Sequence, residues 1–195
     1  MNAFLLPLLG YLCGSLSWAI WIPRWRSGVD IRTVGSGHAT TTNVIRTLGP
    51  AWGALVLVLD ITKGFVPVAL GLYLGLAWYW PVLAGVGAVA GHVWPVFAGF
   101  RGGMGLAATG GGLLALYPLA FPIALGLLIA LLLTLRHGAR ASVFTALLMA
   151  PIFAVLHFPI PLVWFTALAG GLLALRFAAD WRRQYRELWL DRERQ

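Results

Sequence analysis

Apolar stretches of about 20 residues, separated by short polar or aromatic segments, dominate this sequence. With 60% hydrophobic and 10% charged residues and a mean hydropathy of +0.85, the chain is not a soluble domain. Inside a bilayer each backbone polar group must be paired internally, so such stretches form helices. The sequence therefore predicts an all-α integral membrane protein in which residues 1–195 form a single polytopic domain.

The first apolar segment covers residues 2–23, and no Lys or Arg precedes it, which favours a retained span over a cleaved signal peptide. A polar loop is expected over residues 24–50. We expect further apolar helices over 51–76, 81–100, 106–135, 141–158 and 161–176, with the 106–135 stretch broken at Tyr117-Pro118. Residues 177–195 combine arginines with aromatic residues at helical spacing, which predicts a cytoplasmic amphipathic tail on anionic lipid.

The positions of arginine predict how the chain crosses the bilayer. If Tyr117-Pro118 is a turn, there are about seven segments, and every arginine lies on the same side. The short segment before that turn cannot cross about 30 Å of hydrocarbon alone and must be sheltered by protein. The positive-inside rule then predicts an outside N-terminus and a cytoplasmic C-terminus in the cell inner (plasma) membrane. This topology also explains the net charge of +8, so no nucleic-acid partner is expected.

The most polar passage runs from residue 35 to residue 46. Gly35 and Gly37 flank Ser36, and Thr42, Asn43 and Arg46 follow. Glycine backbone N–H groups, hydroxyls and a guanidinium before a helix start form the chemistry of an anion site, with phosphate as the expected anion. The alternative is an ordinary polar loop capped by Thr or Asn. A second glycine-rich passage, Arg101-Gly102-Gly103, offers a weaker signal of the same kind.

Asp60, Lys63 and His92 are ionisable residues that lie within apolar segments. Asp60 and Lys63 are three residues apart on one helical face, so they must point into the bundle as a pair, either structural or supporting a site. His92 is equally compatible with a catalytic and a structural role. Cys13 is the only cysteine, and neither a metal cluster nor a nucleotide motif is visible. We therefore predict no metal and no cofactor.

Together these motifs resemble the PlsY family of membrane glycerol-3-phosphate acyltransferases. That family typically has Gly-Ser-Gly-Asn-x-Gly-Ala-Thr-Asn-x-x-Arg in its first cytoplasmic loop, and this chain matches it at Gly35, Ser36, Gly37, Thr42, Asn43 and Arg46. Two further shared pieces are Asp60-x-x-Lys63-Gly64 and Gly91-His92-x-x-Pro95-x-Phe97-x-x-Phe100-Arg101-Gly102-Gly103. The resemblance implies transfer of an acyl chain from acyl phosphate to the 1-position of glycerol 3-phosphate, giving lysophosphatidic acid for phospholipid biosynthesis.

The chain also departs from the family pattern. The family asparagine after Gly-Ser-Gly is His38 here, and the lysine of Gly-Gly-Lys-Gly is Met104, which has neither charge nor a hydrogen-bond donor. Where the family usually has Arg-His-Arg-x-Asn, this chain has Arg176-Phe177-Ala178-Ala179-Asp180. The histidine and asparagine contacts expected in that segment are therefore missing or rebuilt.

The resemblance assigns roles to residues of this sequence. Ser36 and His92 are the expected catalytic residues, with Ser36 orienting the acyl group or relaying a proton in preference to forming a covalent intermediate. Asp60 and Lys63 are expected to support the site. Substrate binding is expected from Gly35, Gly37, Thr42, Asn43, Arg46, Arg101, Gly102, Gly103 and Ser142. The expected partners are acyl phosphate, glycerol 3-phosphate and membrane lipid.

Three other interpretations remain open from the sequence. The loss of the lysine at Met104 is compatible with a different acceptor, which Arg32, His38 or Arg140 would then bind. A catalytically silent relative that binds lipid would keep the fold without the chemistry. A transporter is the third, since Asp60 and Lys63 lie within an apolar segment.

Overall fold

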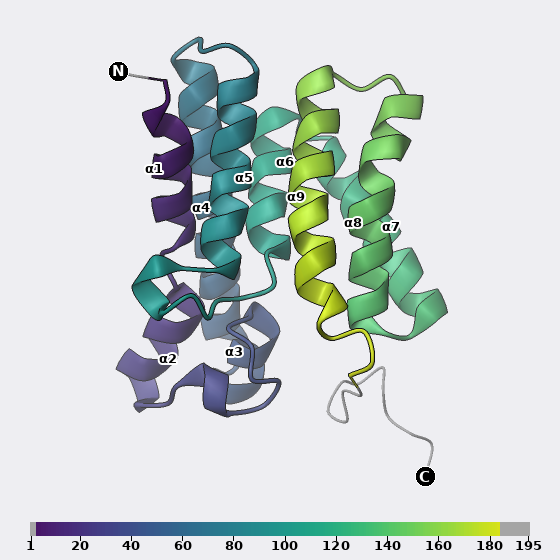
Figure 1. The fold of residues 1–195 in the computed structure, drawn as a ribbon. Coiled ribbons are helices and arrows are strands. Elements are labelled where there is room, and N and C mark those ends of the chain that lie inside the picture. Colours follow the sequence, from purple (N-terminus) through teal and green to yellow (C-terminus); the bar gives the residue numbers. More distant parts are fainter. Residues whose placement is uncertain (1–2, 184–195) are drawn as a thin grey trace.

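The structure, a computed structural model, describes residues 3–183. Over this range the regular secondary structure is entirely helical (Figure 1), which confirms the all-α prediction. The helices are α1 (Leu5–Gly14), α2 (Trp18–Ser27), α3 (Thr41–Leu48), α4 (Pro50–Tyr73), α5 (Tyr79–Val93), α6 (Leu106–Leu116), α7 (Ala120–Leu135), α8 (Gly138–Val155) and α9 (Ile160–Ala178), with the short 3-10 helices η1 (Ile31–Thr33) and η2 (Val96–Ala98).

Five segments of the described chain are long and apolar enough to cross a membrane. They are Leu5–Ser27, Pro50–Tyr73, Tyr79–Ala98, Gly138–Val155 and Ile160–Ala178. The helices α6 and α7 are apolar but shorter, with 11 and 16 residues. The predicted break at Tyr117-Pro118 is confirmed, because α6 ends at Leu116 and α7 begins at Ala120.

The apolar segment predicted over residues 2–23 corresponds to the candidate span Leu5–Ser27, but the chain breaks within it, between α1 and α2. Ser15 donates to the carbonyl of Tyr11 at 2.8 Å, and Ser17 donates to that of Ser15 at 3.1 Å. The break leaves the carbonyl of Leu16 free of the helical ladder, and the ammonium of Lys63 donates to it at 2.8 Å. The interruption therefore gives a buried charge a backbone acceptor.

The segment 24–50 is also more helical than predicted. Helix α2 continues to Ser27, and α3 begins at Thr41. Thr40 is the N-cap of α3, and its hydroxyl accepts a hydrogen bond from the N–H of Asn43 at 3.3 Å. Thr40 thus caps a helix, as the alternative interpretation of this polar loop predicted.

Small residues set the distances between the long helices. A Cβ added at Gly10 of α1 would lie 2.1 Å from the carbonyl oxygen of Ala84 in α5, and one at Gly14 would lie 2.1 Å from that of Ala88. Backbone therefore packs directly on backbone at this interface, as is common between helices in lipid.

Helix α6 is enclosed by its neighbours, as expected for a segment too short to face lipid on its own. None of its residues is exposed. Gly111 packs on the carbonyl of Ile61 in α4, and Gly112 packs on the ring of Phe165 in α9. By contrast, Ala120 is the one buried residue of α7, which leaves the rest of that helix at the periphery.

The two ends of the bundle differ in charge. The N-terminus and the α4–α5 and α8–α9 turns lie at one end, at the top of Figure 1. The α2–α3 segment, the α5–α6 and α7–α8 connections and the end of α9 lie at the other. We call this second end the arginine end, because it carries Arg24, Arg26, Arg32, Arg46, Arg101, Arg136, Arg140, Arg176, Arg182 and Arg183.

The predicted tail begins differently from expectation. Phe177 and Ala178 belong to α9. Trp181 then packs on α8, with its ring centroid 5.9 Å from that of Phe144 and 5.5 Å from the guanidinium carbon of Arg140. The first part of this segment therefore contacts protein, and residues 184–195 of the predicted amphipathic tail lie outside the described residues.

The close approach of α1 and α5 gives a stability prediction. Gly10→Ala should destabilise the bundle by about 1 to 3 kcal/mol, because the added methyl group meets backbone that must move. Gly126→Ala on α7 is the matched control, since nothing lies within 4 Å of its Cβ position. Alanine there should stabilise the helix by about 0.5 to 1 kcal/mol. Thermal melts in detergent should move in opposite directions, and equal melts would contradict the packing argument.

Candidate active site

The loop between α2 and α3 is organised by one buried amide. The Nδ2 of Asn43 lies 2.9 Å from the carbonyl oxygen of Ile31, 3.0 Å from that of Val34 and 3.1 Å from that of His38. Its Oδ1 accepts a hydrogen bond from the N–H of Ser36 at 3.3 Å. We call residues 34–40 the Ser36 loop; its shape depends on this one side chain.

Gly35 is required at its position for two reasons. Its φ of +55° lies in the left-handed region that disfavours side chains, and a Cβ there would lie 2.2 Å from Oδ1 of Asn43. The side chain of Asn43 is completely buried and its amide is already bonded to the loop. The structure therefore places Asn43 as the organiser of the Ser36 loop, where the sequence suggested a direct ligand of substrate.

An ion-pair cluster fixes Arg32 at the edge of the loop. Asp30 accepts from Nε and Nη2 of Arg32 at 3.0 and 2.8 Å, and from Nη2 of Arg24 at 2.8 Å. The hydrogen bonds from Arg32 hold the pKa of the Asp30 carboxyl well below its usual range. Arg32 also donates through Nη1 to the carbonyl of Ala98 at 3.0 Å, which ties this segment to the α5–α6 connection.

The glycine-rich passage after α5 folds back onto the end of that helix. The N–H groups of Gly102 and Gly103 donate to the carbonyls of Val93 and His92 at 3.1 and 3.0 Å. A Cβ at Gly103 would lie 2.3 Å from Nε2 of His92. Both N–H groups therefore already have acceptors in this structure, and neither offers the free donor that the predicted phosphate contact needs. The glycines instead allow the backbone to pass close over His92.

The residue that replaces the family lysine has no place in the site. Met104 is buried among apolar side chains, where it belongs to the same core cluster as Ala139, Leu173 and Phe177. Position 104 therefore contributes apolar packing and no positive charge.

The predicted intramembrane ion pair is confirmed. The Nζ of Lys63 lies 2.8 Å from Oδ1 of Asp60, and both side chains are buried. The Nδ1 of His92 is 3.8 Å from the same oxygen and has no hydrogen-bond partner among the described residues. A cavity of about 10 Å³ separates this group from Ser17 and Gly103. The pair thus lies directly beneath the glycine-rich passage.

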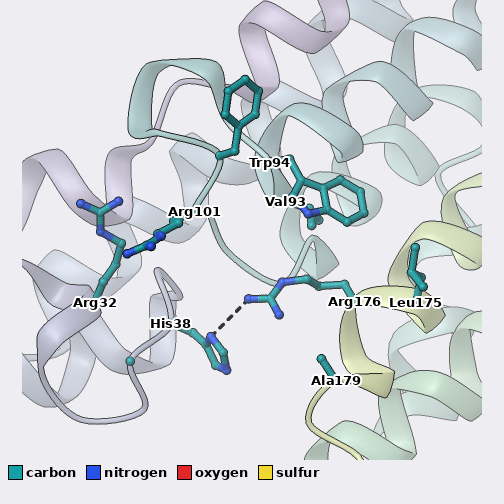
Figure 2. Close-up of a pocket in the computed structure, with 11 residues that line it drawn as sticks. Arg32, His38, Val93, Trp94, Arg101, Leu175, Arg176 and Ala179 are labelled. Atoms are coloured by element: carbon teal, nitrogen blue, oxygen red, sulfur yellow. Dashed lines mark hydrogen bonds between the residues drawn. The ribbon is translucent and has the colours of Figure 1, made fainter.

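A pocket of about 460 Å³ opens at the arginine end. Its lining residues are Arg32, Gly37, His38, Val93, Trp94, Phe100, Arg101, Gly102, Leu175, Arg176 and Ala179. Figure 2 shows Arg32 and Arg101 on one side and Arg176 pointing toward the interior from α9. The pocket therefore joins three guanidinium groups to an apolar wall of Val93, Trp94, Phe100 and Leu175.

Such a pocket suits a ligand that is both anionic and apolar. Guanidinium groups bind phosphate through paired N–H donors, and they stay charged at any physiological pH. The neighbouring indole and aliphatic side chains can bury hydrocarbon. Among residues 3–183, no three His, Cys, Asp or Glu side chains are grouped so that they could hold a metal ion.

The structure brings only some of the predicted residues to this pocket. Gly37, Arg101 and Gly102 line it, and Ser36 is adjacent in the chain to Gly37 and His38. Thr42 and Arg46 are exposed on α3, and Ser142 is buried on α8; none of the three lines the pocket.

Sequence reasoning missed Arg176 and gave Arg32 and His38 a role only if the acceptor differed. Arg176 donates through Nε to the carbonyl of Gly103 at 3.3 Å, so α9 brings its charge next to position 104. The available signal was the position of Arg176 at the arginine-bearing end of the last apolar segment. Its match to the first arginine of the family's Arg-His-Arg-x-Asn pattern also distinguishes it from the other arginines of the tail.

Comparison with known proteins now identifies the family. The family model for glycerol-3-phosphate acyltransferase matches residues 4–187. A glycerol-3-phosphate acyltransferase of Synechococcus sp. (strain JA-2-3B'a(2-13)) is 44% identical over 179 residues, which cover 90% of this chain and 86% of the relative. The chain belongs to the glycerol-3-phosphate acyltransferase family. It is an integral membrane enzyme, an acyltransferase of the PlsY type.

Three further comparisons extend over nearly the whole of this acyltransferase. The glycerol-3-phosphate acyltransferase of Pseudomonas aeruginosa (strain LESB58) is 37% identical over 191 residues, which are 98% of each chain. A crystal structure of PlsY (YgiH) in its glycerol 3-phosphate form is 31% identical, with a TM-score of 0.84 over 94% of this chain and 92% of the other. The lysophosphatidic acid form of PlsY gives a TM-score of 0.81 at 28% identity, over 94% and 91% of the two chains.

The role given to Asn43 can be tested with an isosteric change. Asn43→Asp keeps the shape but removes the N–H donors, so the carbonyl of Ile31 loses its side-chain donor. The carbonyls of Val34 and His38 keep only the backbone N–H groups of Gly37 and Thr40. A buried carbonyl left unpaired costs about 1 to 3 kcal/mol. The substrate-free variant should therefore unfold at a lower temperature, and a protease should cleave it faster in the Ser36 loop. Thr41→Ala, on the same helix, is the control for stability.

One result would contradict this role of Asn43. If Asn43→Asp melted like the unmodified protein and only weakened substrate binding, Asn43 would be a direct substrate ligand, as the sequence suggested.

Proposed function

We propose that this acyltransferase moves a fatty acyl chain from acyl phosphate to the 1-position hydroxyl of glycerol 3-phosphate, giving lysophosphatidic acid. The observation that carries the proposal is the pocket in which three arginines face an apolar wall. Both substrates and the product carry phosphate, and two of the three also carry an acyl chain. The glycerol 3-phosphate and lysophosphatidic acid forms of the related PlsY support the same acceptor and product.

The chemistry asks little of the protein beyond positioning. An acyl phosphate is already activated, so the acceptor hydroxyl can attack the acyl carbon directly. A carbon–oxygen ester bond forms, the bond to the phosphate oxygen breaks, and the released phosphate takes up the hydroxyl proton. The enzyme must hold two phosphates side by side and stabilise the charge that develops on the acyl oxygen.

The pocket suggests how these tasks are divided. Arg32, Arg101 and Arg176 bind the phosphates, and the wall formed by Val93 and Trp94 accepts the start of the acyl chain. Ser36 orients the acyl group or relays the proton from its place in the loop. This role needs no general base beside the Ser36 hydroxyl. A covalent role for Ser36 would require one.

The remaining predicted residues act mainly on this geometry. Gly35, Gly37 and Asn43 shape the Ser36 loop, while Gly102, Gly103 and His92 form the floor above the Asp60–Lys63 pair. Ser142, Thr42 and Arg46 would contact substrate only if the occupied site extends beyond the pocket toward α8 and α3.

The replacement of lysine by Met104 does not require another acceptor. Arg176 places its guanidinium at the carbonyl of Gly103, one residue from that position. The pocket therefore has positive charge near position 104 without a lysine there, which favours glycerol 3-phosphate as the acceptor.

We further propose seven crossings, with the arginine end in the cytoplasm and the protein in the cell inner membrane. The sorting of arginine-bearing connections to one end and uncharged turns to the other supports this topology (Figure 1). In this arrangement α6 crosses within protein, and lipid covers the exposed side of α7.

The activity has a direct test. Purified protein in detergent, given palmitoyl phosphate and glycerol 3-phosphate, should release phosphate and form lysophosphatidic acid in equal amounts. Arg101→Ala should weaken substrate binding by about 1.5 to 3 kcal/mol, since it removes a charge-assisted contact. Arg26→Ala is the control, because that exposed arginine lies at the same end outside the pocket.

Other outcomes of this assay are equally informative. Phosphate release without lysophosphatidic acid would indicate hydrolysis or a different acceptor. Unchanged affinity in Arg46→Ala would remove Arg46 from the site and confine substrate to the pocket. Phosphate release in a mutant lacking Ser36, at the rate of the unmodified protein, would exclude a covalent role for that serine.

The topology can be tested with single cysteines in a Cys13→Ser background. Ala77→Cys lies in the uncharged α4–α5 turn, and Ser27→Cys lies at the arginine end; both positions are exposed. In bacterial spheroplasts an impermeant thiol reagent should label the cysteine at 77 and reach the one at 27 only after permeabilisation. The reverse pattern would invert the proposed orientation.

A further inference from the structure

His38 joins the Ser36 loop to the end of α9. Its ring lines the pocket and contacts three charged side chains from that end. The Nε2 lies 2.6 Å from Oδ2 of Asp180. The Nδ1 lies 3.3 Å from Nη2 of Arg176, a contact that Figure 2 shows as a dashed line. Arg183 approaches Nε2 at 2.8 Å and also donates to the carbonyl of Ser36.

The partners determine which nitrogen carries the proton. A carboxylate only accepts, so the 2.6 Å contact with Asp180 requires an N–H at Nε2, and Nδ1 is left to accept from the Arg176 guanidinium, which only donates. The proton is then on Nε2, which donates to the Asp180 carboxylate. In this tautomer Nε2 cannot accept from Arg183, so the guanidinium of Arg183 is held by the Ser36 carbonyl and by Asp180 Oδ1 at 3.4 Å.

This arrangement orients the guanidinium of Arg176. Its Nε donates to the Gly103 carbonyl and its Nη2 to His38, so two acceptors from different segments hold it in the pocket. Without the acceptor at Nδ1, the long side chain regains rotamer freedom and Arg176 must be ordered again when a phosphate binds.

The two partners His38 and Asp180 are also the two positions at which asparagine is expected from the family pattern. They are 142 residues apart in the chain and form a direct contact. A carboxylate is the strongest acceptor for the N–H at Nε2 of the imidazole, and its negative charge also balances the two neighbouring guanidinium groups. The two departures are therefore physically matched.

We infer that His38 is a positioning residue for acyl transfer, which, with Asp180, holds the Arg176 guanidinium ready for substrate phosphate and ties the end of α9 to the Ser36 loop. The inference rests on the proposed function, in which Arg176 binds phosphate. It assigns no bond-making step to His38, whose ring nitrogens are both engaged.

The arrangement also predicts how binding depends on pH. Burial, together with the charges of Arg176 and Arg183, lowers the pKa of His38 below its usual 6.5, against the opposing effect of Asp180. His38 is therefore neutral in the folded protein at pH 7. Because the pKa of His38 is lowered in the folded protein, the hydrogen bond that orders Arg176 is fully present above the usual histidine pKa. It is lost as pH falls through the lowered pKa. Protonation puts an N–H at Nδ1 facing Arg176, so the bond to Arg176 is lost on the acid side.

The test compares His38→Asn, Asp180→Asn and the double variant that carries both changes. Each single change should raise the KM for one phosphate substrate about tenfold with little change in kcat, the loss expected for one charge-assisted hydrogen bond. The double variant, with its amide pair, should recover most of that loss. His38→Asn should also remove the rise of KM on the acid side. His157→Asn and Arg182→Ala are the controls, because both residues are exposed and neither lines the pocket.

Several results would overturn the inference. One is an unchanged KM in both single variants; another is a fall in kcat and melting temperature with KM constant, which would make the contact merely structural. Additive losses in the double variant would show that the two residues are not matched.

If the unmodified protein transfers no acyl group, the proposed function fails, but the inference is still decided by binding. Glycerol 3-phosphate and inorganic phosphate should then stabilise the unmodified protein in thermal melts and stabilise His38→Asn less. Equal stabilisation of the two proteins would overturn the role of His38.

Discussion

The structure of the arginine end depends on the contacts of one buried group, the ammonium of Lys63. It is held by the Asp60 carboxylate and by the carbonyl of Leu16, which is available only because the chain breaks between α1 and α2. A charge at this depth would be very costly without both partners. The contact therefore joins α4 to the break that starts α2 and the Ser36 loop, and it lies beneath His92 and the glycine-rich passage.

The pocket above this pair is built from three segments that are far apart in sequence. Arg32 comes from the α2–α3 segment, Arg101 from the α5–α6 connection and Arg176 from α9. Two of these guanidinium groups donate to backbone carbonyls of the α5–α6 connection, Arg32 to Ala98 and Arg176 to Gly103. That connection thus orients charges that come from both other segments.

Much of the fold follows from one-dimensional patterns. Apolar length predicts helices in lipid, Tyr117-Pro118 marks the break before α7, and the sorting of arginines corresponds to one end of the bundle. The Asp60–Lys63 pair follows from helical spacing. The break after Gly14 was not predictable in this way, because its stabilising partner is a lysine 47 residues later. The same is true of Asn43, whose acceptors are carbonyls of a loop that only the folded chain brings around it.

The sequence alone determined the class of protein, the apolar segments, the charged end and the motifs that indicate phosphate chemistry, because each depends on residues close together in the chain. Tertiary structure decided which of those residues meet. It placed Met104 in the core, paired the N–H groups of Gly102 and Gly103, and left Arg46 outside the pocket. It also brought His38 to Asp180 across 142 residues. Helix packing sets such distances, since small residues let backbones touch, and no local pattern encodes where a distant side chain will lie.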